Sequence, residues 1–169
     1  MKAQYDGSSF LELLQLEHPH LLPNVSLSAH GIAEPIPHGT TVLAIKFNDG
    51  VLVAGDRLAI AGNSVASRDV VKVFATDNYS CSAISGAAGP SIEMAKILSV
   101  ELEHYEKIEG RALELEGKAN KLSQMLRQNL PAAMQGLAVV PLFAGFDTRR
   151  QPGRLWKYDI TGGNRKSVG

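Results

Sequence analysis

The sequence predicts an α+β fold built on antiparallel strands, and two observations lead to this prediction. Alternating apolar stretches occur in turn-linked pairs within residues 41–86, whereas apolar residues at helical spacing follow within residues 90–135. Two more strand-like stretches, 137–147 and 153–163, come last. Strands and helices therefore form separate runs, which favours an antiparallel sheet with helices stacked on one face.

Composition narrows the class of protein. A chain of 169 residues suits one domain with a core of ordinary size, and its 17 basic and 17 acidic residues lack the excess of positive charge typical of nucleic-acid binders. Cys81 is the only cysteine, so no disulfide framework or thiolate metal cluster is expected, and it is predicted to be a small buried strand residue. The sequence has neither a signal-peptide core nor a run of about 18 apolar residues, so a cytoplasmic protein is expected.

Residues 1–39 differ in character from the rest. The stretch 8–16 predicts one short amphipathic helix, which Pro19 and Pro23 end. Loosely patterned sequence with several prolines and glycines follows as far as Gly39. This part is typical of a leader that packs on something else.

The strands are expected as two hairpins. Residues 41–47 and 51–56 form the first, around a turn at 48–50, and residues 70–77 and 79–86 form the second. In the expected register of the first hairpin, Thr40 faces Leu58. Asp56 is then the diagonal neighbour of Thr40 on the same face, at roughly 7–8 Å.

Two helices are expected after the hairpins. Pro90 suits the first position of a helix that extends to Gly110. The second helix is expected over residues 115–135, where Pro131 either kinks it or restarts it.

Thr40 directly follows Gly39 at the start of the first strand. A threonine hydroxyl becomes a good nucleophile when a base takes its proton, and the residue's own α-amine is such a base if the residue begins the chain. The hypothesis therefore requires cleavage of the Gly39–Thr40 bond. Glycine suits the leaving side because it has no side chain to obstruct the attacking hydroxyl. Residues 1–39 would then be a propeptide that masks the amine.

Three further residues are candidates for the chemistry. Lys72 lies among apolar neighbours of its strand, and a buried lysine requires a partner, which Asp56 would supply. A cation near Thr40 would lower the proton affinity of its amine and hydroxyl. The N–H of Gly86, close to a helix N-terminus, can stabilise an oxyanion. Each residue also has an alternative role that involves no catalysis. Lys72 would then protect an exposed sheet edge, Asp56 would belong to a strand-end turn, and Gly86 would lie in an ordinary strand-to-helix turn.

The stretches HGTTVLAIKF, VLVAGDR, RDVVKVF, ISGAAG and VELEHYEKIEG, in this order and spacing, resemble a proteasome β subunit of the actinobacterial type. The similarity runs from Gly39 to about Gly163, and residues 8–23 resemble the propeptides of that bacterial group. The resemblance implies a propeptide over residues 1–39. It also implies that residues 40–169 belong to the four-layer αββα sandwich of N-terminal-nucleophile hydrolases.

The resemblance also implies roles for single residues. Thr40 corresponds to the nucleophile exposed by autocatalytic processing, Asp56 and Lys72 to the residues that set its charge state, and Gly86 to the oxyanion donor. The implied specificity pocket is small and apolar, so cleavage after apolar residues is expected; it comprises Ala59, Val70, Phe74, Ile84, Ala88 and Ile92. Ala88 and Ile60 correspond to positions that hold the substrate as an added strand, although many relatives have threonine in place of Ile60.

One departure from the family lies at the end of the sequence. The family's chain continues through a glycine-serine motif, further helices and strands, whereas this sequence ends at Gly169. The chain is therefore expected to hold the first half to two-thirds of the fold. The helix containing Ile92 and the last strands are expected to expose apolar faces.

The leading expectation is a threonine-type endopeptidase that degrades unfolded proteins inside a chamber of stacked rings. The alternatives are an inactive ring subunit with a structural role, the simpler bacterial two-ring peptidase, and a small-molecule amidohydrolase. Expected partners are heptameric rings of α subunits and other β subunits, an ATPase ring and polypeptide substrates. The helix near Tyr105 is either an inter-ring contact or a plain core helix. No metal, organic cofactor, nucleic acid or membrane is expected.

Overall fold

The computed structural model describes residues 40–61, 64–147 and 153–166. All of them belong to Pro35–Gly169, one of the two units into which the chain divides. The helix expected over residues 8–16 lies outside the described residues. None of the described helices is long and apolar enough to cross a membrane.

The first hairpin differs from the expected register by one residue. Strands β1 (Val42–Phe47) and β2 (Gly50–Gly55) pair antiparallel, with Phe47 opposite Gly50 and Val42 opposite Gly55. The expected pairing of Thr40 with Leu58 is therefore wrong. Only two residues form the turn. Two-residue turns are favoured in hairpins because their backbone twist matches the twist of the flanking strands. As a result Thr41 lies beside Asp56, whose N–H donates to the Thr41 carbonyl at 3.0 Å.

Five strands form the main sheet, and every neighbouring pair is antiparallel. In spatial order they are β5 (Val73–Asp77), β6 (Ser80–Ala83), β7 (Leu142–Phe146), β8 (Gly153–Tyr158) and β9 (Asn164–Lys166). The expected α+β class with antiparallel sheets is thus confirmed. Strand β9 was not expected, because the sequence after residue 163 lacks an apolar alternation.

A second short hairpin, also not expected, consists of β3 (Ala59–Ala61) and β4 (Ser64–Ser67). Its two strands pair only with each other, as a separate two-stranded sheet. The two residues between them, Gly62 and Asn63, lie outside the described residues. The strands are too short for their alternation to be recognised in the sequence.

The helices begin and end close to their expected bounds. Helix α2 (Ala88–Glu109) starts two residues before Pro90 and is capped by Gly110 in the left-handed region, at φ 67°. The expected second helix is two helices, α3 (Leu115–Gln128) and α4 (Leu130–Ala133), with Asn129 between them. Pro131 lies in the first turn of α4, so of the two possibilities it restarts the helix.

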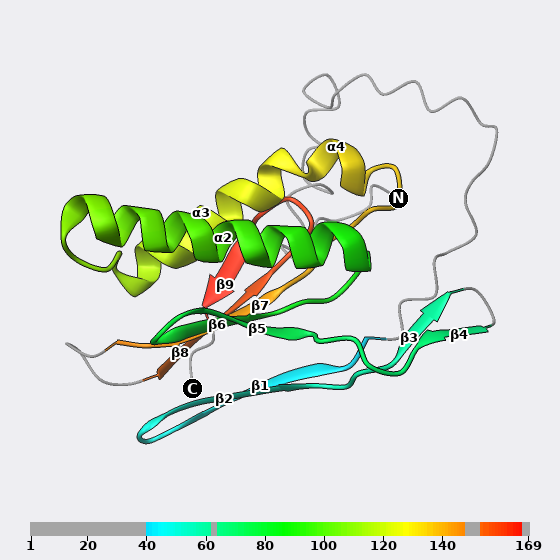
Figure 1. Cartoon of the computed structure of the whole chain (residues 1–169), viewed down its shortest axis with the longest axis horizontal. Helices are drawn as coiled ribbons and strands as arrows, with labels where there is room; N and C mark the ends of the chain where they lie inside the picture. Colours follow the sequence, from blue (N-terminus) through cyan, green and yellow to red (C-terminus); the bar gives the residue numbers. More distant parts are fainter. Residues whose placement is uncertain (1–39, 62–63, 148–152, 167–169) are drawn as a thin grey trace, which may run out of the picture. The chain divides into compact units, whose positions relative to one another are not determined.

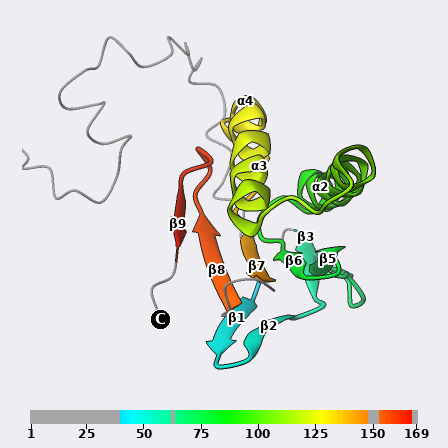
Figure 2. The same cartoon turned by 90° about the vertical axis from the view of Figure 1, so that its left-hand side faces the viewer.

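The described residues form three layers. Helices α2 and α3 lie on one face of the five-stranded sheet and the β1–β2 hairpin on the other (Figures 1 and 2). The core between helices and sheet includes Leu98, Leu122, Phe143 and Trp156. The rings of Phe143 and Trp156 pack with their centroids 5.7 Å apart. Cys81 of β6 is only partly buried, and burial raises the pKa of its thiol.

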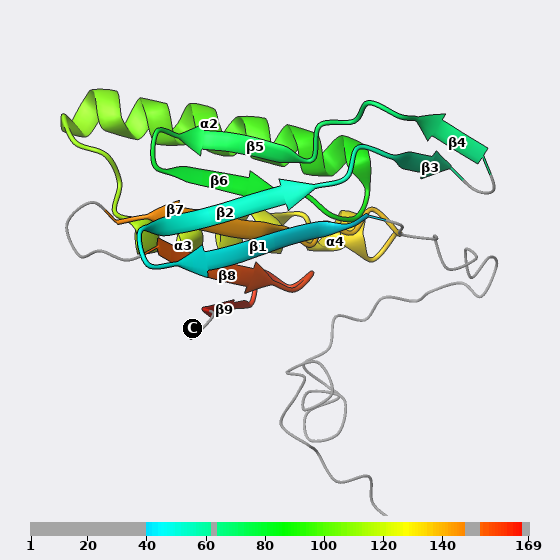
Figure 3. The same ribbon diagram turned by 90° about the horizontal axis from the view of Figure 1, so that it is seen from below.

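Exposed apolar side chains lie on α2, as expected, and on the β1–β2 hairpin, but not on the last strands. The last strands do not expose an apolar face, because Trp156 and Tyr158 of β8 are buried. Helix α2 buries one side and exposes Ile97, Val100 and Ile108 on another. The β1–β2 hairpin, seen in front of the sheet in Figure 3, has four large apolar side chains that are 44–55% exposed: Leu43, Ile45, Phe47 and Leu52.

A buried ion pair joins α3 to the β5–β6 turn. The Lys118 ammonium contacts the Asp77 carboxylate, and the two side chains are only 5% and 18% exposed. Asp77 also accepts hydrogen bonds from the Ser80 hydroxyl at 2.7 Å and the Tyr79 N–H at 2.9 Å. Removing one partner would leave the other charge buried without compensation.

We therefore expect Lys118→Met to lower the free energy of unfolding by about 3–5 kcal/mol. The double variant Asp77→Asn/Lys118→Met should recover part of this loss, because no buried charge is left unpaired. Urea unfolding followed by circular dichroism measures both. Lys121→Met, which breaks an exposed pair with Glu101, is the control and should cost roughly 0–1 kcal/mol. A Lys118→Met variant as stable as this control would contradict the account.

Candidate functional site

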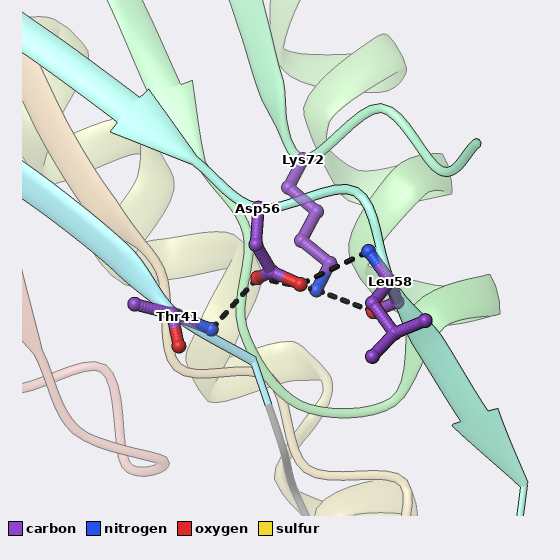
Figure 4. Close-up of polar contacts among 4 residues, drawn as sticks. All are labelled: Thr41, Asp56, Leu58 and Lys72. Carbon is purple, nitrogen blue, oxygen red and sulfur yellow. Dashed lines mark hydrogen bonds and ion pairs between the residues drawn. The ribbon is translucent and has the colours of Figure 1, made fainter. Parts of the chain in front are cut away.

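The candidate site is organised by Lys72, which lies immediately before β5. Its Nζ donates to Asp56 Oδ1 at 2.7 Å and to the Leu58 carbonyl at 2.7 Å, as Figure 4 shows. The Thr41 N–H donates to the same carboxylate oxygen, and the Leu58 N–H donates to Asp56 Oδ2, both at 2.9 Å. One carboxylate therefore holds the start of β1, the segment after β2 and the lysine together.

Burial explains why Lys72 needs these partners. Its side chain is 5% exposed, against 33% for Asp56, so Lys72 is no guard of an exposed sheet edge. The ammonium would be costly at this position without a counter-charge and hydrogen-bond acceptors. The Lys72 carbonyl accepts the Ile84 N–H at 2.8 Å, which fixes the lysine backbone against the segment after β6. The expected pairing of Lys72 with Asp56 is thus present.

Gly55 makes room for this arrangement at the end of β2. A Cβ atom on Gly55 would lie 3.3 Å from the Cβ of Lys72 and 3.3 Å from a methyl carbon of Val42. Such contacts are closer than ordinary packing distances. Glycine at this position therefore lets the chain before β5 approach the hairpin closely enough for Lys72 to reach Asp56.

The electrostatics of the site favour an ionised Asp56. The hydrogen bond from Lys72, then those from the Thr41 and Leu58 N–H groups, lower the pKa of Asp56 from 3.8 to about 2. Asp56 is also an ordinary turn residue, since it accepts the N–H of Leu58 two positions further on. Asp56 is therefore both the strand-end turn residue expected as one alternative and the hydrogen-bond partner of Lys72.

Gly86 lies where the chain passes from β6 to α2. Its φ of +103° is unfavourable for other residues, and a Cβ atom there would lie 2.2 Å from the Ala138 carbonyl oxygen. Gly86 bridges to Val139, and the flanking bonds are Ala87 N–H to the Ala138 carbonyl and Val140 N–H to the Ser85 carbonyl. In this antiparallel pattern the N–H of Gly86 points away from Val139.

Thr40, Lys72 and Gly86 line one cavity of about 260 Å³. Five of the expected substrate-binding residues line it too: Ala59, Ile60, Val70, Ile84 and Ala88. Apart from the lysine, the side chains of these residues are apolar, small or hydroxylated. The structure thus brings together eight of the residues singled out in the sequence.

Two expected pocket residues do not line this cavity. Phe74 lies within β5, opposite Ser82, and Ile92 is in the first turns of α2. Gly39, on the leaving side of the expected cleavage, lies outside the described residues. Sequence reasoning missed six lining residues: Leu58, Ser85, Ala87, Ser91, Gly136 and Leu137. The first four neighbour residues that were predicted, whereas Gly136 and Leu137 follow α4, and only long-range pairing brings them here.

The other cavities of the described chain contain neither Thr40 nor the Lys72–Asp56 pair. Two further cavities, of about 140 and 420 Å³, lie away from Thr40, and the larger is lined mainly by the C-terminal half of α2, together with Leu113 and Lys121. Within the described ranges, no three or more histidine, cysteine or acidic side chains are placed to hold a metal ion. The cavity that contains Thr40 is therefore the candidate site.

The lowered pKa of Asp56 makes a prediction about stability. Because the folded pKa lies below 3.8, the contribution of Asp56 is present above about pH 4 and is lost as the pH falls towards 2. The difference in unfolding free energy between wild type and Asp56→Asn should therefore shrink between about pH 5 and pH 2.5, as urea unfolding measures. Asp49→Asn, in the exposed β1–β2 turn, is the matched control. A difference that is constant with pH would show that Asp56 is not stabilised as an anion.

Comparisons with known proteins show the family of this chain. The proteasome subunit family matches residues 36–167. A proteasome subunit beta of Streptomyces griseus subsp. griseus is 53% identical over 164 residues, which cover 96% of this chain and 58% of the relative. The proteasome subunit beta of Acidothermus cellulolyticus is 51% identical over 161 residues, covering 92% of this chain and 56% of the relative. That of Acidimicrobium ferrooxidans is 50% identical over 162 residues, covering 96% and 59%.

The chain thus spans a little over half the length of these relatives, while nearly all of it is matched. The match to the family includes every residue that lines the candidate cavity. The chain belongs to the proteasome subunit family, as a β subunit similar to those of actinobacteria.

Proposed function

We propose that this chain is a catalytic proteasome β subunit, a threonine-type endopeptidase whose nucleophile is Thr40. The observation that carries the proposal is the cavity shared by Thr40 and a buried Lys72 held by Asp56. The relatives supply the class of protein, and the shared cavity supports the proposed choice of residues. Residues 1–39 are proposed as the propeptide and Gly39–Thr40 as the bond cleaved.

The charge of Lys72 is the basis for the proposed activation. An ammonium has three N–H donors, and two of them reach Asp56 and the Leu58 carbonyl. We propose that the third is directed into the cavity that Lys72 lines. A fixed cation there lowers the proton affinity of a nearby α-amine and hydroxyl, so that more of the amine is neutral and able to act as a base.

The proposed reaction has two stages. The Thr40 hydroxyl attacks the substrate carbonyl and gives its proton to the α-amine, a bond forms between Oγ and the carbonyl carbon, and the leaving amine takes a proton as the peptide bond breaks. Water then hydrolyses the ester and frees the hydroxyl. In the first round the attacked carbonyl is that of Gly39, and the Thr40 nitrogen is still part of the peptide bond, so a water molecule and not the α-amine takes the hydroxyl proton. The acyl group of residues 1–39 moves from the Thr40 nitrogen to Oγ, the nitrogen takes a proton and becomes the α-amine, and water then hydrolyses the ester and releases the propeptide.

Gly86 is proposed as the oxyanion donor. Its N–H points away from Val139, as the bridge between the two residues requires, and Gly86 lines the cavity. A backbone donor held by pairing on the opposite side does not need to reorganise when charge develops on the substrate oxygen. The Gly86 φ of +103° is the conformation that presents the donor, and it restricts the position to glycine.

Substrates are proposed to be unfolded polypeptides cleaved after apolar residues. The cavity walls are mainly apolar, so a charged side chain would lose its solvation without gaining a partner. Residues 59–60 and 86–88 are proposed to hold the substrate as an added strand. Phe74 and Ile92, which do not line the cavity, are proposed to contact the substrate because of the resemblance.

The proposal extends to assembly. The exposed face with Leu43, Ile45, Phe47 and Leu52 is where a fourth layer of helices would complete an αββα sandwich. Heptameric rings of α and β subunits, with an ATPase ring that feeds polypeptide, are the proposed partners, and the cytoplasm is the proposed compartment. An inactive ring subunit with a structural role is the alternative outcome.

Processing tests the proposed nucleophile. We expect the intact mass of the purified, assembled wild type to correspond to a chain that begins at Thr40, while Thr40→Ala retains residues 1–39. Thr40→Ser is the matched control and should still be trimmed, because it keeps a hydroxyl on the same atom. Trimming of Thr40→Ala at the same bond would rule out self-processing. Wild type that keeps residues 1–39 after assembly would favour the inactive subunit.

Removing the cation tests the proposed activation. We expect Lys72→Ala to abolish both trimming and peptide cleavage while assembly persists, because the amine and hydroxyl of Thr40 then keep their ordinary proton affinities. Gel filtration and a fluorogenic peptide assay measure the two properties. Lys46→Ala removes an exposed lysine of β1 and is the control. Assembled Lys72→Ala with wild-type rates would show that the lysine serves only the structure.

A further inference from the structure

Leu137 lines the candidate cavity but was not indicated by the sequence. It lies between α4 and β7, and its side chain is 46% exposed. The other apolar walls come from residues 58–60, 70 and 84–88, all of which precede α2 or begin it. Leu137 is therefore the one large apolar side chain that the described later half of the chain brings to the cavity.

The local backbone fixes Leu137 in place. Gly136, at φ +92°, closes the turn that follows α4, and the N–H groups of Gly136 and Leu137 donate to the carbonyls of Ala133 and Ala132, respectively, both at 3.0 Å. This pair of bonds is a Schellman motif, in which glycine supplies the left-handed residue. The Leu137 carbonyl accepts Asn129 Nδ2 at 3.2 Å. The peptide groups on both sides of the Leu137 Cα are thus held.

The next residues connect Leu137 to the proposed oxyanion donor. Ala138 accepts the Ala87 N–H at 2.8 Å, and Val139 bridges to Gly86. Leu137 directly precedes this pairing, so its position is set by the same contacts that set Gly86. A half-exposed side chain on a backbone held from both sides can restrict a cavity without itself being part of the packed core.

We propose that Leu137 is a specificity-determining residue, whose isobutyl group limits the size of the apolar substrate side chain that the cavity accepts. The inference rests on the proposed function and adds to it the residue that sets the size limit. Asn129 is a positioning residue, since it acts through the Leu137 carbonyl. Shortening Leu137 should widen the cavity for bulky aromatic side chains, and enlarging it should narrow the choice to small ones.

The test compares peptides that differ only in the residue before the scissile bond. For the assembled particle, we expect Leu137→Ala to raise the ratio of kcat/KM for tryptophan over leucine on the order of 10-fold, and Leu137→Phe to lower it. Asn129→Asp, which keeps the shape but removes the donor, should shift the ratio in the same direction as Leu137→Ala, by less. Met134→Ala truncates a side chain 49% exposed that does not line the cavity, and should leave the ratio unchanged.

The outcomes separate the two proposals. If Thr40-dependent cleavage is present and the ratio is the same in all Leu137 variants, the inference is wrong and the proposed function stands. If cleavage does not depend on Thr40, the proposed function is wrong.

A binding measurement then decides the inference by itself. The leucine and isoleucine methyl signals of the full chain are followed by NMR during titration with acetyl-alanyl-alanyl-leucine and acetyl-alanyl-alanyl-tryptophan. We expect the Leu137 methyl signals to shift together with those of Ile84. Shifts at Ile84 without shifts at Leu137 would overturn the inference, and so would the absence of shifts at both.

Discussion

The arrangement of the site depends on one interaction, the contact of a buried lysine ammonium with the Asp56 carboxylate and the Leu58 carbonyl. A cation whose side chain is 5% exposed is stable only if its partners are fixed, and here the backbone N–H groups of Thr41 and Leu58 hold the carboxylate. Thr40, the neighbour of Thr41, is therefore positioned by the same group that neutralises the lysine. Structure and proposed chemistry share one set of contacts.

The backbone around the site allows Lys72 to reach its partners. Gly55 allows the backbone before β5 to come close to the end of β2, and the Ile84 N–H anchors the Lys72 carbonyl. On the other side of the cavity, Gly86 adopts a conformation that its contact with Ala138 makes unavailable to any side chain. The two sides of the site thus depend on glycines for different physical reasons, close approach in one case and a positive φ in the other.

Much of this was predictable from the sequence, and the exceptions have physical causes. A lysine among apolar strand residues requires a counter-charge, so its pairing with Asp56 was expected before the fold was known. The register of β1 and β2 was not, because the Asn48-Asp49-Gly50 stretch is compatible with two-residue and three-residue turns. Leu137 was not predicted either. It reaches the cavity because the neighbouring Val139 pairs with Gly86, and this pairing joins segments far apart in the sequence.

The central claim is that the Thr40 hydroxyl, in the cavity that Lys72 also lines, carries the acyl group of the substrate. The most direct measurement is peptide mapping by mass spectrometry of the assembled particle, quenched with acid during turnover of a peptide. The account predicts an acyl ester on the Thr40 hydroxyl, in a chain whose Thr40 α-amine is free. An acyl group on another residue, or turnover by chains in which Thr40 is still joined to Gly39, would contradict it.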